Sequence, residues 1–455
     1  MTAETEAIAQ FVARTSFEDL PPAVVSQSKK CLMDFIGLSL AGSREKDIRI
    51  LAEVVRTLGG REQATVIGFP FKTSAPNAAF VNAAMGHALQ LDDGDRLTEA
   101  HLGIEIIPSA LSVGEIQQCD GKDLLKSIVL GYEVAMRVGY AVSPHHRKRG
   151  FSPNGTLGVF GAAAAASSIL RLDVDKVQDA LGSAGTQAAG LEQFCIDGSA
   201  SQFLNPSHAA QCGVTSALLA REGFSGSRQI LEGACGFCKA FADQYDLDEI
   251  TSDLGEEFQI TKAYFKPYPT CRIFHPQIDA LLHITKGNSI RPEEVKEVVV
   301  KAHAKDIEMM CNPPPETVAA ARLNMPYCLA CALVDGEVAL DQFTEERIGN
   351  RVIIEMMSRI SFVPADQELD SFAPPLCGAI VTVTTHSGKT FEHAVSHPLG
   401  EPENPLGDKE LAQRFRSLAL SNIGDEKKVS NILDTILRLD QLDKVSDLTS
   451  LLGSA

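Results

Sequence analysis

The sequence predicts a mainly α-helical protein in which a large all-helical domain is accompanied by a smaller α+β domain. Apolar residues recur every three or four positions through most of residues 1–260, and again from Asp408 to about Leu452, which is typical of amphipathic helices. Between about Phe258 and Gly400 the pattern changes to proline-rich segments and to the alternating apolar residues of strands. A chain of 455 residues is about three times a typical domain length, so we expect two domains.

The N-terminal part is predicted to consist of helices joined by short turns. Pro21 and Pro22 begin the second helix and Gly42 ends it, as expected from the preference of proline for helix starts and of glycine for helix ends. A short strand or turn is expected near residues 64–68. Further helices are expected over residues 74–89, 108–118 and 122–140.

A segment rich in glycine and alanine follows, from Arg149 to Leu172. Such small side chains allow backbones to approach each other or a ligand closely, so a tightly packed central helix is expected here. The small-residue, helical pattern continues to about Phe241, and nearly all of residues 1–260 is therefore predicted to be helix.

The smaller domain begins with a proline-rich segment, residues 264–276, which is expected to be a loop because Pro267, Pro269 and Pro276 interrupt any helix. A hairpin is predicted around Gly388, where a turn needs positive φ. The remaining elements are helices at residues 277–284, 324–335 and 347–357, and strands at 295–303, 359–363, 379–385 and 390–395.

Composition and simple sequence patterns exclude several classes of function. The net charge of −18 argues against a nucleic-acid partner, because phosphate binding needs a basic surface. No apolar run is long enough to span a membrane, and the N-terminus lacks the pattern of a secretory signal, so the cytoplasm is the expected location.

Of the eleven cysteines, two CxxC pairs, Cys235/Cys238 and Cys328/Cys331, could nominally bind zinc, but they are about ninety residues apart and the second lies in a predicted buried helix. We expect no metal.

Ionisable residues are concentrated between Gly86 and Pro108, where one apolar helix ends and another apolar stretch begins. Helix ends present reactive side chains to cavities, so this stretch is predicted to form one wall of an active site. Asp and Gly are equally common in ordinary helix capping, and that alternative stays open. The residues concerned are Asp92, Asp93, Asp95, Glu99 and His101. A basic run, His145–Arg149, could attract an anionic ligand or form an exposed loop.

Several ordered motifs carry a resemblance to a known family. They are DFIGLSLAG (34–42), GHALQLDD (86–93), GYEVAMRVG (131–139), HRKRGFSPNGTLGVFGAAAAA (146–166), DGS (197–199), FKPYPTCRIFHP (265–276) and PENPL (402–406). With these motifs the chain resembles the MmgE/PrpD family, which includes 2-methylcitrate dehydratases, cis-aconitate decarboxylases and iminodisuccinate epimerases. The resemblance implies a helical domain of residues 1–269 and 397–455, a lid of residues 270–396, a homodimer, and catalysis without a metal or organic cofactor.

The reactions of this family share the removal or delivery of a proton, or of CO₂, at a carbon next to a carboxylate. We therefore expect a lyase, a dehydratase or decarboxylase, that acts on a small anionic di- or tricarboxylic acid. A dicarboxylate epimerase, such as one acting on iminodisuccinate, and a non-catalytic binding relative are the alternatives. Such chemistry needs a base near neutral pKa and donors around the developing enolate.

Histidine is suited to the acid and base roles, and His101 and His275 are the predicted catalytic residues. Arg272 and Lys266, on the same proline-rich segment as His275, are predicted to bind a substrate carboxylate. His146 is predicted to contact substrate or to order its loop.

Asp93 and Asp92 are predicted to orient the backbone and a histidine rather than to bind an acid directly. Gln90, Gly94, Ser152 and Gln202 occupy positions at which the resemblance implies Asp, Thr, His and Lys in the decarboxylase branch. These changes predict a substrate or reaction other than cis-aconitate decarboxylation.

Overall fold

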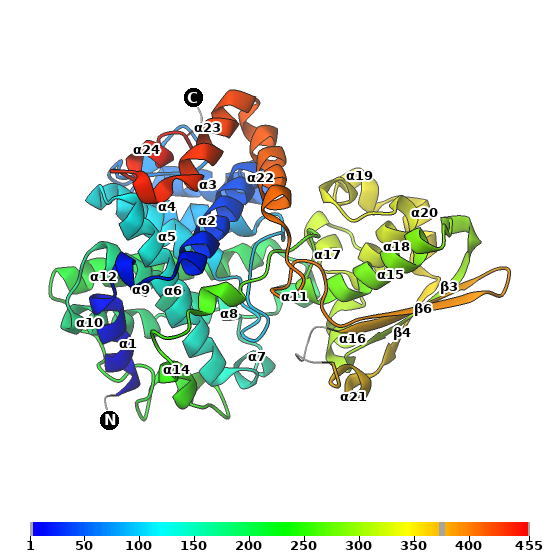
Figure 1. Ribbon diagram of the computed structural model, residues 1–455, viewed down its shortest axis with the longest axis horizontal. Helices are drawn as coiled ribbons and strands as arrows, with labels where there is room; N and C mark the ends of the chain where they lie inside the picture. Colours follow the sequence, from blue (N-terminus) through cyan, green and yellow to red (C-terminus); the bar gives the residue numbers. More distant parts are fainter. Residues whose placement is uncertain (1–2, 373–377, 454–455) are drawn as a thin grey trace. The chain divides into compact units, whose positions relative to one another are not determined.

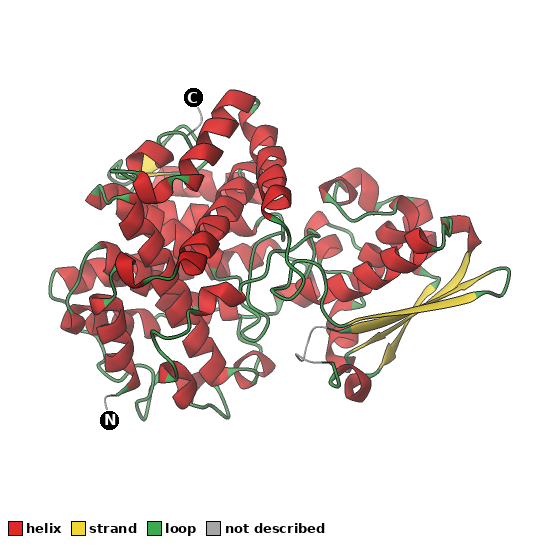
Figure 2. Ribbon diagram, viewed as in Figure 1, coloured by secondary structure: helices red, strands yellow, loops and turns green. Residues whose placement is uncertain are grey.

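The computed structural model describes residues 3–372 and 378–453 and confirms the predicted mainly α fold with a smaller α+β part (Figure 2). The chain divides into two compact units. Unit one comprises the residues up to Glu192, Ser201–Ala263 and the residues from Gly407 on. Unit two comprises Gln193–Ala200 and Tyr264–Leu406. Among the described residues, none of the helices is long and apolar enough to cross a membrane.

Unit one is helical apart from a small two-stranded ribbon. Its first helices are α1 (Glu4–Arg14), α2 (Pro22–Gly42), α3 (Lys46–Leu58), α4 (Ala75–His87), α5 (Gly103–Gln117), α6 (Gly121–Val142), α7 (His145–Lys148), α8 (Pro153–Thr156), α9 (Gly158–Ile169) and α10 (Val174–Gly185). They are followed by α12 (Leu204–Arg221), α13 (Phe237–Phe241), α14 (Asp248–Thr251), α22 (Asp408–Ile423), α23 (Glu426–Leu437) and α24 (Ser446–Thr449). The ribbon pairs β1 (Ala64–Thr65) with β2 (Lys72–Thr73). Helix α22, the first of the three C-terminal helices, packs along α2 (Figure 1).

The centre of unit one is α9, whose residues are all buried between α5, α6 and α12. The glycine and alanine run makes this packing possible. A Cβ atom added to Gly131 of α6 would lie 2.9 Å from the carbonyl oxygen of Gly161 of α9, and the reverse distance is also 2.9 Å. The expectation that backbones approach closely in this segment is therefore confirmed.

Two helix boundaries in unit one differ from the prediction. Helix α5 begins at Gly103 rather than at residue 108, so Pro108 lies inside it. The apolar residues before Pro108 are buried as part of this helix, and their burial outweighs the hydrogen bond that proline removes. The stretch from Glu222 to Ala263 was expected to be largely helical but contains mainly turns, because Gly223, Gly226, Gly233 and Gly236 interrupt it.

Unit two holds a four-stranded sheet with helices packed on it. Its helices are α11 (Phe194–Asp197), α15 (His275–Gly287), α16 (Ala304–Met310), α17 (Val318–Arg322), α18 (Met325–Asp335), α19 (Glu345–Ile348), α20 (Arg351–Met357) and α21 (Asp366–Leu369). Its strands are β3 (Val295–Ala302), β4 (Ile360–Pro364), β5 (Ala379–Thr385) and β6 (Thr390–Val395). The strand order is β4-β3-β5-β6, with β3 and β4 parallel and the other pairs antiparallel. The predicted hairpin of β5 and β6 is confirmed.

One boundary in unit two changes the setting of a predicted catalytic residue. His275 was expected to lie on a proline-bounded loop, but it is the first residue of α15, and Arg272–Phe274 forms a short 3₁₀ turn before it. Pro276 does not interrupt this helix, because backbone N–H groups in the first turn have no acceptor within the helix. A proline there costs no hydrogen bond.

Candidate functional site

The acidic stretch connects two helices of unit one and carries a buried cluster of histidines and carboxylates. Helix α4 ends at His87, the chain forms a loop over residues 88–102, and α5 begins at Gly103. The cluster, which we call the histidine cluster, consists of His87, Asp92 and His101. It lies where two rigid helices hold both ends of the loop.

A single carboxylate oxygen of Asp92 faces both imidazole rings. Asp92 Oδ2 lies 2.9 Å from Nδ1 of His87 and 3.4 Å from Nδ1 of His101. His101 Nδ1 also lies 2.8 Å from the carbonyl oxygen of Asp93, so this nitrogen carries a proton and donates it. The neutral His101 ring therefore has its lone pair at Nε2. The His101 side chain is 15% exposed and that of His87 3%, so His101 is the more accessible of the two.

The loop that carries His101 is held by contacts from the basic run and from the residues after it. The backbone N–H of His101 donates to Asn154 Oδ1 at 2.8 Å. Arg147 forms ion pairs with Glu99 and, at 3.4 Å, with Glu192. Glu99 has a left-handed backbone (φ 55°), which is unusual for a residue with a Cβ atom. Arg147 of the basic run therefore helps to fix the position of the loop.

Asp93 points toward the start of α5. Its carboxylate accepts a hydrogen bond from the Tyr132 hydroxyl of α6, and a Cβ added to Gly103 would lie 2.3 Å from Asp93 Oδ1. Only glycine leaves room for this carboxylate at the start of the helix. The orienting role of the aspartates stays a prediction.

Two of the altered positions meet beside the histidine cluster. Gln90 Nε2 lies 3.1 Å from His87 Nε2 and donates to Gln202 Oε1 at 2.7 Å. Gln90 adopts a left-handed backbone (φ 53°), and both glutamines are buried. Gly94 lies in the same loop.

His146 belongs to the short helix α7, and Ser152 lies between α7 and α8. His146 stacks on Phe151 and Phe241, and its Nε2 is 2.7 Å from the Thr156 hydroxyl. Burial, with a smaller contribution from the charge of Arg149, lowers the pKa of His146 to about 4, so the ring is neutral at physiological pH. Ser152 is buried and precedes α8, and its N–H donates to the carbonyl of Gly190. This setting favours the alternative in which His146 orders its loop.

Unit two holds the other predicted residues, and all of them are buried. Nε and Nη2 of Arg272 lie 2.8 and 2.7 Å from Oε1 of Glu401, the residue before the PENPL segment, so Arg272 forms a buried ion pair. His275 packs edge to face against Tyr268, with 5.3 Å between ring centroids. Lys266 is fully buried.

Comparison with known proteins decides the family. The model of the MmgE/PrpD N-terminal domain matches residues 6–250, and that of the MmgE/PrpD C-terminal domain matches residues 268–440. The chain belongs to the MmgE/PrpD family.

Relatives of known name align over nearly the whole chain. A cis-aconitate decarboxylase-like protein of Aspergillus oryzae is 28% identical over 99% of this chain and 97% of its own length. Cis-aconitate decarboxylase of Aspergillus terreus is 24% identical, with 99% and 96% covered. Cis-aconitate decarboxylase of Mus musculus is 25% identical, with 98% and 93% covered.

Some MmgE/PrpD motifs are explained by packing alone. In GYEVAMRVG, Gly131 allows α6 to approach α9, and Glu133 forms a buried ion pair with Arg137. The motif GHALQLDD, in contrast, supplies His87 and Asp92 to the histidine cluster. The sequence analysis missed His87, although a histidine at the end of a helix, five residues before an aspartate, could have indicated it.

Glu105 is a second residue that the sequence analysis missed. It lies in the first turn of α5, is fully buried, and neither carboxyl oxygen has a hydrogen-bond partner among the described residues. Gly158 of α9 makes room for it, because a Cβ there would lie 2.6 Å from Glu105 Cγ. Burial, followed by the charges of Asp92 and Asp93, raises the pKa of Glu105 well above its ordinary value. A neutral, protonated Glu105 therefore adjoins the charged aspartates.

Replacing Glu105 with glutamine should stabilise the protein, and the gain should grow with pH. Below the ordinary pKa of 4.5, Glu105 is protonated in both the folded and the unfolded chain. Above it, only the unfolded chain ionises readily, so the wild-type protein loses about 1.4 kcal/mol of stability per pH unit until the raised pKa is reached. The neutral glutamine has no such loss. Urea unfolding of both proteins at a series of pH values measures the difference.

Glu115 on the same helix provides the matched control. Its buried carboxylate accepts from Thr65 N at 2.6 Å and lies 2.9 Å from Lys72 Nζ, so Glu115→Gln should destabilise. A Glu105→Gln variant that is less stable than wild type, with the difference independent of pH, would show that Glu105 is ionised in the fold.

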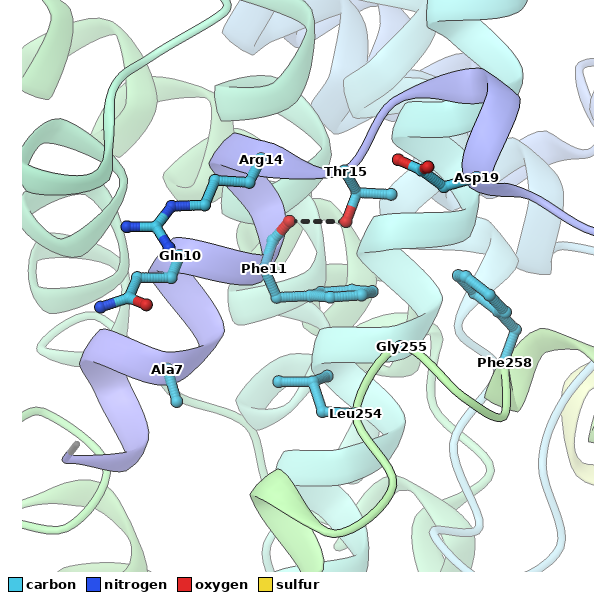
Figure 3. A pocket seen from close by; sticks show the side chains of 9 residues that line it. All are labelled: Ala7, Gln10, Phe11, Arg14, Thr15, Asp19, Leu254, Gly255 and Phe258. Carbon is cyan, nitrogen blue, oxygen red and sulfur yellow. Dashed lines mark hydrogen bonds between the residues drawn. The ribbon is translucent and has the colours of Figure 1, made fainter. Parts of the chain in front are cut away.

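One cavity of unit one is separate from the histidine cluster. The cavity drawn in Figure 3 has a volume of about 630 Å³ and lies between α1 and the loop at Leu254–Phe258, with Arg14 and Gln10 on one side and Asp19 on the other. None of the three residues of the histidine cluster lines it.

The described residues contain no group of three His, Cys, Asp or Glu side chains arranged to hold a metal ion. The two CxxC pairs lie in different units. Cys328 and Cys331 are buried in α18, whereas Cys235 is exposed and Cys238 is buried.

Proposed function

We propose that this protein is a cofactor-independent lyase that transfers a proton at, or releases CO₂ from, a carbon next to a carboxylate of a small di- or tricarboxylic acid. The full-length similarity to proteins named cis-aconitate decarboxylases supports this reaction class. The observation that carries the proposal is the orientation of His101, whose Nδ1 is occupied by the Asp93 carbonyl and faces Asp92, so that Nε2 is the basic atom.

In the proposed reaction, Nε2 of His101 accepts or returns the proton at the reacting carbon. The imidazolium that forms is stabilised by the Asp92 carboxylate at 3.4 Å and by the Asp93 carbonyl at 2.8 Å. A base held in place by a second group is the general arrangement of histidine catalysis.

The roles predicted for His275, Arg272 and Lys266 of unit two are kept as proposals. His275 is the second acid or base, and the two cations are proposed to bind carboxylate groups of the substrate and to stabilise the enolate. The homodimer implied by the family resemblance and the cytoplasmic location expected from the sequence remain predictions.

A dicarboxylate epimerase is the second candidate, because the contact between Gln90 and Gln202 favours a substrate or reaction other than cis-aconitate decarboxylation. The family resemblance implies an Asp and a Lys at these positions in decarboxylases, whereas here two neutral amides are hydrogen-bonded at 2.7 Å. The loss of both charges indicates a substrate that differs from cis-aconitate in its charged groups.

Incubation with a panel of carboxylic acids in deuterium oxide tests the proposal, because exchange of hydrogen for deuterium next to a carboxylate is common to the lyase and epimerase reactions. We expect wild-type protein, dialysed against a chelator, to catalyse exchange into at least one acid, detected by proton NMR. Loss of CO₂, loss of water or inversion of the carbon then identifies the reaction. Failure to exchange, decarboxylate or dehydrate any di- or tricarboxylate of the panel would contradict the proposal and favour a non-catalytic relative.

A further inference from the structure

A continuous chain of hydrogen bonds runs from Gln202 through Gln90 and His87 to Asp92. Its three contacts are 2.7 Å between the two amides, 3.1 Å between Gln90 Nε2 and His87 Nε2, and 2.9 Å between His87 Nδ1 and Asp92 Oδ2. Every member is at most 5% exposed. The remaining ring contacts of His87 are with His101 and the edge of Phe203, so Asp92 and His101 are the titratable groups that face it.

The chemistry of the groups sets the direction of this chain. His87 Nδ1 faces a carboxylate, so it carries a proton and donates. In the neutral ring Nε2 is then an acceptor, and it must face the amide nitrogen of Gln90 rather than its oxygen. The same nitrogen has a second hydrogen, which requires an acceptor on Gln202, and Gln202 presents Oε1. At these three contacts every donor faces an acceptor only while His87 is neutral.

We propose that Gln90 and Gln202 form an amide relay that holds His87 as the neutral Nδ1–H tautomer. The negative charge of Asp92 is then not neutralised by His87 and is available to stabilise a protonated His101. A second proton on His87 would place an N–H against the amide N–H of Gln90. Both amides would then have to turn over together, because Gln90 Oε1 would otherwise face Gln202 Oε1. The relay therefore directs the proton of the proposed reaction to His101, and Gln90 and Gln202 are positioning residues.

The backbone conformation of Gln90 indicates that its side chain is required at this position. Gln90 is buried and left-handed, with φ 53°, a conformation that is unfavourable for a residue with a Cβ atom. Glycine would relieve this strain but would remove the amide that joins His87 to Gln202.

Nitrogen-15 NMR of the histidine rings tests the relay directly, because protonated and unprotonated ring nitrogens have widely separated shifts. The signals of His87 are assigned by comparison with a His87→Gln variant. Near neutral pH we expect wild-type His87 to show a protonated Nδ1 and an unprotonated Nε2. In Gln90→Glu, a carboxylate faces Nε2, and both ring nitrogens should be protonated.

Two further variants complete the test. Gln90→Asn keeps an amide and tolerates the left-handed backbone, but it is too short to join both partners. Asp92 still holds the proton on Nδ1, while no amide N–H opposes a second proton at Nε2, so the doubly protonated ring of His87 should become populated. Gln211→Glu is the matched control, because Gln211 of α12 makes a similar amide contact, at 3.0 Å with Asn77 of α4, and should leave His87 unchanged. An Nε2–H tautomer or a doubly protonated His87 in wild type would overturn the relay, as would an unchanged His87 in Gln90→Glu.

The link of the relay to catalysis rests on the proposed function, but the tautomer is measured without turnover. Where wild-type protein turns over a substrate, Gln90→Glu should lower kcat by roughly 10- to 100-fold, the usual effect of losing a group that orients a histidine, while Gln211→Glu stays near wild type. An inactive wild type with the expected tautomer contradicts the proposed function alone. An active wild type with the wrong tautomer contradicts the relay alone.

Discussion

Replacing His101 with alanine should lower turnover by roughly 10²–10⁴-fold, which is the usual contribution of a positioned acid or base. The variant loses Nε2, the proposed basic atom, while the backbone contact of residue 101 with Asn154 is unaffected by the change. The measurement is the initial rate on whichever acid the exchange experiment identifies. Circular dichroism of the variant establishes that the fold is retained.

His208→Ala is the matched control for this experiment. His208 lies on α12 in the same unit, is part-buried, and has Nε2 3.2 Å from the carbonyl of Gln187, but it is outside the histidine cluster. Its replacement should leave turnover near the wild-type value. Near-normal turnover of His101→Ala would mean that the base lies elsewhere, and His275 would be the next candidate.

Replacing Arg137 with methionine should lower the free energy of unfolding by about 3–5 kcal/mol, the usual cost of removing one partner of a buried ion pair. Arg137 Nε lies 2.6 Å from Glu133 Oε1, and the two side chains are 2% and 0% exposed. Arg137 also donates to the carbonyl oxygens of Ser252 and Asp253. The variant leaves the Glu133 carboxylate buried without its cation and two loop carbonyls without a donor. Urea unfolding measures the loss.

The double variant Glu133→Leu/Arg137→Leu tests the reason for this loss. It removes both charges, so it should be less destabilised than Arg137→Met even though more polar groups are lost. Arg56→Met, which removes an exposed partner of Glu53 on α3, should leave the urea midpoint unchanged. Equal losses of unfolding free energy in the Arg137 and Arg56 variants would show that burial of the Arg137–Glu133 ion pair does not affect stability.

The local sequence pattern was sufficient for the fold class and for the elements whose signals are short-range. The β5–β6 hairpin and α18 were predicted closely, because strand alternation around a glycine turn and an uninterrupted apolar run depend on neighbouring residues. The starts of α5 and α15 were placed too late. Pro108 was predicted to be the first residue of its helix, whereas it lies inside α5 and is accommodated by packing. Pro276 was predicted to interrupt any helix, whereas it lies in the first turn of α15.

The site shows the same division. The acidic stretch and His101 could be recognised from the sequence, because residue type and a helix end indicate where chemistry is concentrated. The other features of the site depend on how the helices of unit one pack. Packing places His87 beside the carboxylate of Asp92 and buries Glu105 against Gly158. It also brings Gln90 into hydrogen-bond contact with Gln202, 112 positions away in the sequence. Protonation, tautomer and burial depend on which atoms lie within about 3–4 Å, and only the folded chain determines those distances.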